Sequence, residues 1–409
     1  MNMKIRLIVM GFLQFAVWGA WLISLGSYLG ITLGFDDLQI GSFFATMGIA
    51  SLFMPAIMGI IADRWIPAQK LLGICHFVAA AFIIAAASQT QYVPLYTLML
   101  LSVMFYMPTI ALSNSVAYNA LSKAKLDPVT AFPPIRVWGT VGFIVAMLAV
   151  DNLKFGLTAN QLYLSAALSA ILGIYSFTLP NCEVSKGVSN ASFVEKLGLK
   201  AFSLFKEPRM AIFFIFSMML GMSLQITNAF ADGYIKSFGD VKVYGDTYLG
   251  TFGVEHSTTL ISLSQISETL CILLIPFFLR RFGIKKVMLI SMVAWVLRFA
   301  LLGAGNPGSG VWMFVLSMLV YGVAFDFFNI SGSLFVEQET SDEIRSSAQG
   351  VFMIMTNGLG AFIGSYVAGF VAKHYGWPLS WYIFAAFAAV VAVLFAIVFR
   401  YKHTPEVSN

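Results

Sequence analysis

The sequence carries little charge, and this scarcity is its most informative feature. Only 11% of its 409 residues are Asp, Glu, Lys or Arg, while 59% are apolar and the mean hydropathy is +0.84. A soluble domain has about 25% charged residues, so this composition predicts a membrane protein. The net charge of +5 is spread along the chain without a basic block, which excludes a nucleic-acid-binding protein.

Cysteine and histidine are scarce as well. The three Cys residues lie far apart and form no CxxC motif, and the four His residues show no metal-ligand spacing. The GxxxxGK[ST] loop that cradles phosphates is missing, and no nucleophile is paired with a base. We therefore expect no metal, no cofactor and no enzymatic activity, and energy for any transport must come from something other than ATP.

Long apolar runs, by contrast, are abundant. A bilayer core about 30 Å thick needs about 20 apolar residues per helix, which leaves room for about twelve spans. Apolar runs and the breakers between them predict spans at 7–30, 39–61, 71–89, 93–119, 134–150, 160–180, 210–231, 257–279, 286–304, 311–335, 346–372 and 379–399. The predicted organisation is an all-α membrane protein with a six-helix bundle at 1–180, a polar cytoplasmic linker at 181–208 and a second six-helix bundle at 209–409.

The distribution of basic residues tests this layout. Cytoplasmic loops of membrane proteins collect Lys and Arg. With the N-terminus inside, 19 of the 24 basic residues fall in inner segments, 4 fall in outer segments, and Arg298 lies within a span. This asymmetry indicates twelve spans with both termini in the cytoplasm.

The two predicted halves carry related inner turns. The turn after the second span begins GIIADR at 59–64, and the turn after the eighth span reads LRRFGIKK at 279–286. Two ordinary basic turns would also give this pattern. Their equivalent positions nevertheless resemble the repeated loop of the major facilitator superfamily, which implies two bundles that rock around a site near the middle of the membrane.

Two carboxylates lie within predicted spans, where an ionisable side chain is costly and is by default a functional candidate. Glu268 lies in the eighth span and Asp326 in the tenth, and each has an amide on the same helix face, Gln265 and Asn329 respectively. Gln225 and Asn228 repeat the pattern in the seventh span. A single pair is better explained by hydrogen bonds between helices than by a binding site. Three pairs, two of them with a carboxylate, favour a polar cavity.

Aromatic residues accompany these polar pairs. Tyr321, Phe325 and Phe328 share a helix face beside Asp326. In the first half, Arg136 shares a face with Thr140 and Phe143, although a basic anchor at the membrane surface is an equally good interpretation of Arg136. Aromatic rings next to amides and carboxylates suit a ligand that has a planar ring and several hydroxyls.

Several long polar stretches resemble the bacterial nucleoside:proton symporters of the major facilitator superfamily, and the resemblance runs from end to end. These stretches are FPPIRVWGT at 132–140, RMAIFF at 209–214, LQITN at 224–228, SQISE at 264–268, FDFFNISG at 325–332, FVE at 335–337 and SSAQG at 346–350. The resemblance implies a multi-pass permease of the bacterial inner membrane that takes up nucleosides together with protons. It implies no partner protein, and we expect a monomer surrounded by lipid.

The resemblance also implies the residues of the substrate site. In the first half these are Arg136, Thr140 and Phe143. In the second half they are Gln225, Asn228, Gln265, Glu268, Tyr321, Phe325 and Asp326.

Proton coupling is expected at Glu268 or Asp326, because burial favours the neutral, protonated form of a carboxyl group. Protonation from outside and release inside would then couple proton entry to alternating access. A symporter of sugars or other small metabolites on the same fold remains an alternative, since a fold does not determine its cargo. An uncoupled facilitator is a further alternative, which the two carboxylates disfavour.

Overall fold

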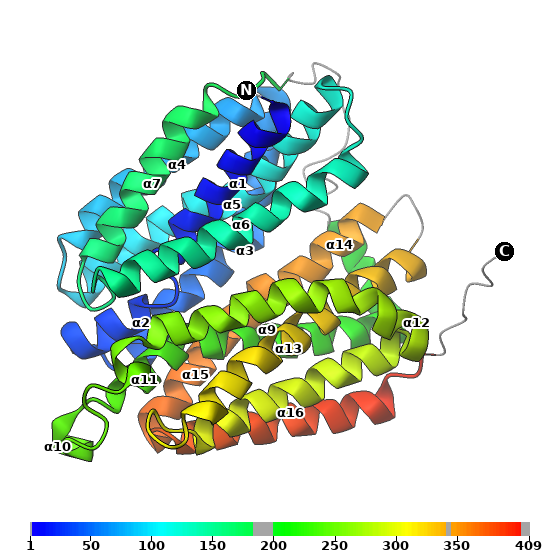
Figure 1. Cartoon of the computed structure of the whole chain (residues 1–409). Coiled ribbons are helices and arrows are strands. Elements are labelled where there is room, and N and C mark those ends of the chain that lie inside the picture. The colour runs from blue at the N-terminus through cyan, green and yellow to red at the C-terminus, as the bar shows by residue number, and fades with distance from the viewer. Residues whose placement is uncertain (1, 183–198, 341–344, 402–409) are drawn as a thin grey trace. The chain divides into compact units, whose positions relative to one another are not determined.

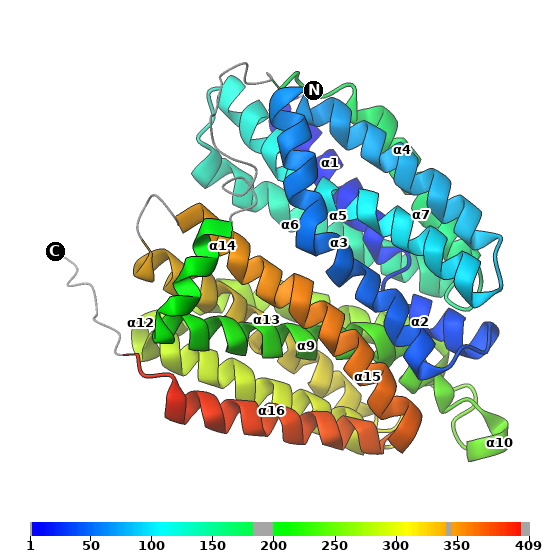
Figure 2. The ribbon, with the colours of Figure 1, turned by 180° about the vertical axis from the view of Figure 1, so that it is seen from behind.

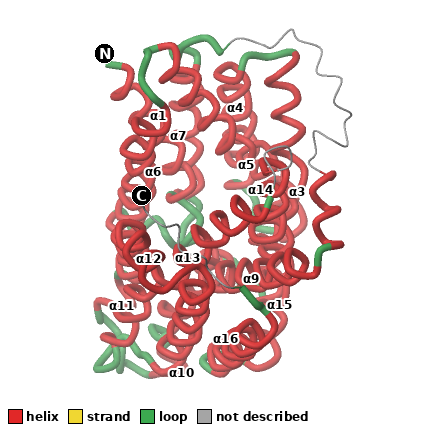
Figure 3. Tube along the Cα trace, turned by 90° about the vertical axis from the view of Figure 1, so that its right-hand side faces the viewer, coloured by secondary structure: helices red, strands yellow, loops and turns green. Residues whose placement is uncertain are grey.

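The computed structural model describes residues 2–182, 199–340 and 345–401, and within these ranges it contains helices and loops but no strand (Figure 3). Hydrocarbon offers the backbone no hydrogen-bond partner, so a chain this apolar satisfies its amides within helices. The chain divides into two compact units, Met1–Ser192 and Phe193–Asn409. Most of the predicted linker at 181–208 lies outside the described residues.

The first unit is a bundle in which α1 packs against α6 and α7, and α4 packs against α5 and α7 (Figure 1). Its elements are α1 (Met3–Gly19), α2 (Leu25–Ser27), the π-helical segment η1 (Tyr28–Thr32), α3 (Asp37–Arg64), α4 (Ala68–Ala87), α5 (Tyr92–Lys123), α6 (Pro128–Asn152) and α7 (Asn160–Ser176).

Local sequence explains where several of these helices begin and end. Asp36 and Gln39 form a reciprocal capping box at the start of α3, each side chain accepting a hydrogen bond from the other's backbone N–H. The predicted first span is interrupted, because α1 ends at Gly19 and the chain continues through a turn into α2 and η1. The fifth span begins at Pro128, six residues before the predicted start, and its helix includes both Pro133 and Pro134.

The second unit is built around α12 and α13, with α16 against α12 and with η3 and α15 along α9 (Figure 2). Its elements are the 3-10 segment η2 (Leu199–Lys206), α9 (Pro208–Ser237), α10 (Val241–Tyr244), α11 (Phe252–Glu255), α12 (Ser257–Ala304), α13 (Val311–Glu339), α14 (Arg345–Met353), the π-helical segment η3 (Ile354–Gly360), α15 (Ala361–Tyr375) and α16 (Leu379–Val398).

Gly283 divides α12 into two segments. Its backbone has φ 74° and ψ 167°, a conformation that glycine adopts without steric cost. The break falls between the predicted spans at 257–279 and 286–304. Over the described residues nine helices are long and apolar enough to cross a membrane. Counting the two segments of α12 separately and adding the 17-residue helices α1 and α7 gives a total consistent with the predicted twelve.

The contact between α12 and α13 depends on Gly322, which has no side chain. A Cβ atom on Gly322 would lie 2.5 Å from the carbonyl oxygen of Ser267, well inside van der Waals contact. The Ser267 hydroxyl donates to the carbonyl of Leu319, and the backbone N–H of Gly322 lies 3.3 Å from the same hydroxyl oxygen. Small residues allow membrane helices to approach this closely, so Gly322 fixes how α13 is set against α12.

We predict that Gly322→Val lowers the melting temperature of the detergent-solubilised protein, because the new side chain must push two backbones apart. Overpacking of this kind costs about 1–3 kcal/mol. Gly350→Ala is the matched control, since its Cβ would enter open space. Equal melting temperatures for Gly322→Val and Gly350→Ala would contradict the close contact.

Candidate functional site

Helix α13 carries the aromatic and acidic centre of the candidate site. Tyr321 and Phe325 lie one turn apart, with ring centroids 5.8 Å apart and planes inclined by only 13°. Asp326 follows directly and is only 3% exposed. The structure therefore places the rings of Tyr321 and Phe325 side by side, as their spacing predicts.

The first segment of α12 places Glu268 and Gln265 beside this centre. Glu268 is half-buried and lies near enough to Asp326 for the two carboxyl groups to interact electrostatically. Gln265 interacts with the phenol of Tyr321, which is also near both carboxyl groups. Among the described residues, Oδ2 of Asp326 has no hydrogen-bond partner. A buried carboxyl oxygen without a partner is costly, which makes Asp326 a candidate for binding a proton or a ligand.

The third predicted pair lies on α9. The Nδ2 atom of Asn228 donates to Oε1 of Gln225 over 3.2 Å, so the two amides share a face as predicted. Gln225 directly follows Leu224, and Asn228 lies one turn beyond it. Leu224 in turn lines a cavity of the second unit.

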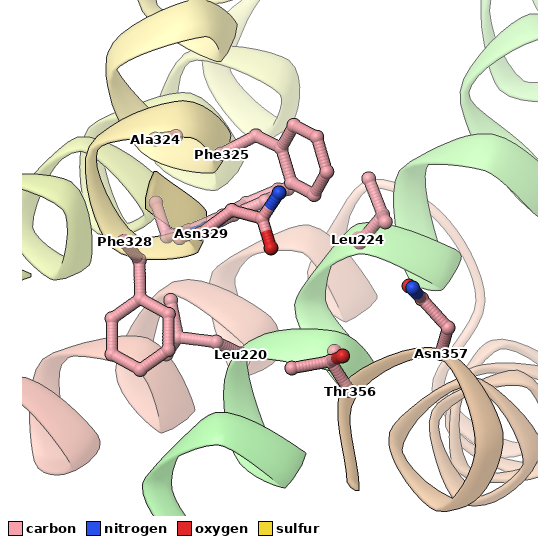
Figure 4. Close-up of a pocket in the computed structure, with 10 residues that line it drawn as sticks. Leu220, Leu224, Ala324, Phe325, Phe328, Asn329, Thr356 and Asn357 are labelled. Atoms are coloured by element: carbon pink, nitrogen blue, oxygen red, sulfur yellow. The ribbon is translucent and has the colours of Figure 1, made fainter. Parts of the chain in front are cut away.

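That cavity lies between α9, α12, α13 and η3 (Figure 4). Its volume is about 20 Å³, enough for one water molecule. It combines apolar and aromatic walls with three polar side chains. The lining residues are Leu220, Gly221, Leu224, Trp295, Ala324, Phe325, Phe328, Asn329, Thr356 and Asn357.

Sequence reasoning did not assign Trp295, Thr356 or Asn357 to the site. Thr356 and Asn357 lie on η3, and π-helical turns occur frequently at functional sites. Apart from a weak contact of 3.7 Å to the sulfur of Met353, the structure gives the Asn357 amide no hydrogen bond within the described residues. The available signal was an amide near the middle of an apolar span.

The residues assigned in the first unit form a separate group on α6. The guanidinium of Arg136 lies 4.0 Å from the ring centre of Phe15 on α1, and Thr140 follows one turn later. The buried ring of Phe143 meets Trp18 edge-on, with centroids 6.3 Å apart. Arg136, Thr140 and Phe143 thus share one helix face, while their aromatic neighbours on α1 were not anticipated.

A buried polar network joins α1, α4, α5 and α7 next to this group. His76 binds Gln14 over 3.0 Å and Ser169 over 2.8 Å through its two ring nitrogens. The Gln14 amide donates to Thr109 over 2.7 Å, and its backbone carbonyl accepts a hydrogen bond from Tyr106. The network connects residues of four helices, so it stabilises the bundle.

Arg298 lies within a predicted span, where charged side chains usually pair with one another or with backbone carbonyls, and the described residues contain no ion pair for it. Its Nη1 atom instead donates to the carbonyl of Ser317 over 2.7 Å, and its guanidinium carbon lies 4.6 Å from the ring centre of Tyr321.

The chain is similar to known proteins over almost its whole length. A family model described as Nucleoside H+ symporter matches residues 1–404. The nucleoside permease NupG of Escherichia coli K12 is 50% identical over 410 residues, which cover 98% of this chain and 97% of the relative. The xanthosine permease of the same organism is 50% identical over 413 residues, covering 99% of this chain and 98% of the relative.

Solved structures give the same result. The crystal structure of the nucleoside transporter NupG matches with a TM-score of 0.91 at 50% identity, covering 98% of this chain and all of that chain. A D-xylose-proton symporter matches with a TM-score of 0.72 at 12% identity, covering 97% of each chain, which is a likeness of fold alone. The predicted major facilitator fold and the predicted family are confirmed. The chain belongs to the nucleoside H+ symporter family.

Proposed function

We propose that this protein carries nucleosides into a bacterial cell across the inner membrane, together with protons, by alternating access. Family membership supports the nucleoside and the proton. The excess of basic residues in the predicted inner segments supports cytoplasmic termini. The protein works as a monomer surrounded by lipid, with residues 1–180 and 209–409 as its two bundles.

The nucleoside-binding residues of the second unit are Gln225, Asn228, Gln265, Glu268, Tyr321, Phe325 and Asp326. The parallel rings of Tyr321 and Phe325 offer an aromatic surface beside two carboxyl groups. A nucleoside has a planar base that stacks on aromatic rings and a ribose whose hydroxyls bind carboxylates and amides. In the first unit, Arg136, Thr140 and Phe143 take the same role from one face of α6.

The observation that carries the proton-coupling proposal is the buried Asp326 next to Glu268. Two ionised carboxylates in a poorly hydrated interior repel each other, and a bound proton removes that repulsion. A proton bound from outside would neutralise one of the two carboxylates and so remove the repulsion between them, and nucleoside binding would supply hydrogen bonds to the pair. Both events favour the closed state from which the protein opens inward.

Uptake measurements test the proposed function. Labelled uridine, adenosine and xanthosine, with xylose as a sugar control, are offered to proteoliposomes that contain the protein, with and without an inward proton gradient. We expect uptake of nucleosides but not of xylose, and accumulation only with the gradient. Accumulation of xylose, or nucleoside uptake that is indifferent to a protonophore, would contradict the proposal.

We predict that Glu268→Gln and Asp326→Asn abolish accumulation, because neither amide can release a proton. With one proton per nucleoside, a proton-motive force of about 100 mV supplies about 2.3 kcal/mol, or about fiftyfold accumulation. The variants should fall to a ratio of about one. Glu339→Gln is the control, because Glu339 lies on α13 like Asp326 and the substitution removes only a partly exposed ion pair with Arg209. Undiminished accumulation in both variants would contradict the assignment of Glu268 and Asp326 as the proton-coupling residues.

We also predict that Asn357→Ala and Asn329→Ala raise KM for nucleosides, because both amides line the cavity beside Phe325. Loss of one hydrogen bond costs about 0.5–1.5 kcal/mol, which corresponds to roughly two- to twelvefold in KM. Gln349→Ala is the matched control. Its amide lies on α14 and bonds the Ser333 carbonyl over 2.7 Å, away from the cavity lining. Equal KM values in all three variants would show that the cavity is not part of the nucleoside-binding site.

A further inference from the structure

Arg298 is a buried cation whose charge is not matched by a carboxylate among the described residues. It lies on the second segment of α12 and is only 2% exposed. A guanidinium stays charged in proteins, and burying an uncompensated charge is costly. Its Nε atom has no hydrogen-bond partner within the described part of the chain. Because burying this charge costs free energy, Arg298 is a candidate for a functional role.

The neighbours of Arg298 show where its interactions are directed. Besides the Ser317 carbonyl, its Nη1 atom lies 3.4 Å from Oγ of Ser264 and 3.9 Å from the sulfur of Met318. In return, Oγ of Ser317 donates to the backbone carbonyl of Arg298 over 3.1 Å. These contacts hold the guanidinium between the two segments of α12 and α13, directly against the ring of Tyr321.

The Tyr321 ring is enclosed on several sides. Arg298 lies over it at 4.6 Å, and Trp295, one turn earlier on α12, meets it edge-on at 6.2 Å with an interplanar angle of 88°. Phe325 stacks in parallel with it at 5.8 Å. Arg298 therefore holds the plane of Tyr321, and Tyr321 holds the plane of Phe325, which lines the cavity.

We propose that Arg298 is a positioning residue for nucleoside binding, which acts through the face of Tyr321 to fix the Tyr321–Phe325 aromatic surface. The proposal rests on the proposed substrate site at Tyr321. A cation on a desolvated ring is stabilised by the ring's negative face, and this attraction restrains the ring without any contact between Arg298 and the nucleoside. An ammonium group can occupy the same face but lacks the planar fork that also binds the Ser317 carbonyl.

The test measures KM and kcat for uridine uptake in three variants. Arg298→Met should raise KM roughly five- to thirtyfold with little change in kcat, because a cation–π contact in a desolvated site is worth that factor. The KM of Arg298→Lys should lie between that of Arg298→Met and that of the wild type. Ser317→Ala is the control. It removes the hydrogen bond to the Arg298 carbonyl but keeps the backbone oxygen that holds the guanidinium, so its KM should stay within about twofold of wild type.

A double-mutant cycle separates positioning from general stabilisation. In a Tyr321→Leu background the ring face is gone, so adding Arg298→Met should change KM by less than about twofold. If the factors by which Arg298→Met and Tyr321→Leu raise KM multiply in the double variant, the two residues act independently and the proposal is overturned. A rise of KM in Ser317→Ala as large as that in Arg298→Met would also overturn it. If Arg298→Met does not accumulate in the membrane, Arg298→Lys takes its place in the cycle.

The outcomes also distinguish this inference from the proposed substrate site. An unchanged KM in Tyr321→Leu alone would count against the site itself. A raised KM in Tyr321→Leu together with a wild-type KM in Arg298→Met and Arg298→Lys would count against Arg298 only.

Discussion

The cost of keeping carboxyl groups inside a membrane-spanning bundle is the constraint on which the second unit depends. Asp326 is almost fully buried, Glu268 is its electrostatic neighbour, and one oxygen of Asp326 has no hydrogen-bond partner among the described residues. The His76 network, which has a partner on each ring nitrogen, stabilises the packing of the first unit. Buried polar atoms outside the candidate site, such as Oγ of Ser331 and Nε1 of Trp381, also lack a partner among the described residues. What distinguishes Asp326 is therefore the second carboxyl group beside it.

Close packing of α12 on α13 is what holds these groups in place. Gly322 allows the backbone of α13 to meet the first segment of α12 at Ser267, and the hydroxyl of Ser291, on the second segment of α12, donates to the carbonyl of Ala324. Helix α13 is therefore attached to both segments of α12. The carboxyl groups of Glu268 and Asp326 are therefore presented by rigid helices, which is what a site that discriminates between protonated and ionised states requires.

Much of this arrangement follows from the sequence because helical periodicity is a local property. The paired residues at i and i+3, the stacked Tyr321 and Phe325, and the break between the eighth and ninth spans were all predicted from spacing and composition. The π-helical segments were not, since the choice between i+4 and i+5 hydrogen bonding depends on neighbouring helices. The partners of Arg298 were also missed, because a backbone carbonyl and a ring face on another helix leave no pattern in the sequence.

Proton-coupled transport requires that each nucleoside enters together with protons. The internal pH of proteoliposomes that contain the protein reports this coupling, when the membrane potential is clamped at zero and no pH gradient is imposed. When uridine is added outside, we expect the interior to acidify in proportion to the uridine that enters, and we expect Glu268→Gln to abolish the acidification. Uridine entry with no change in internal pH would show that transport is not coupled to protons.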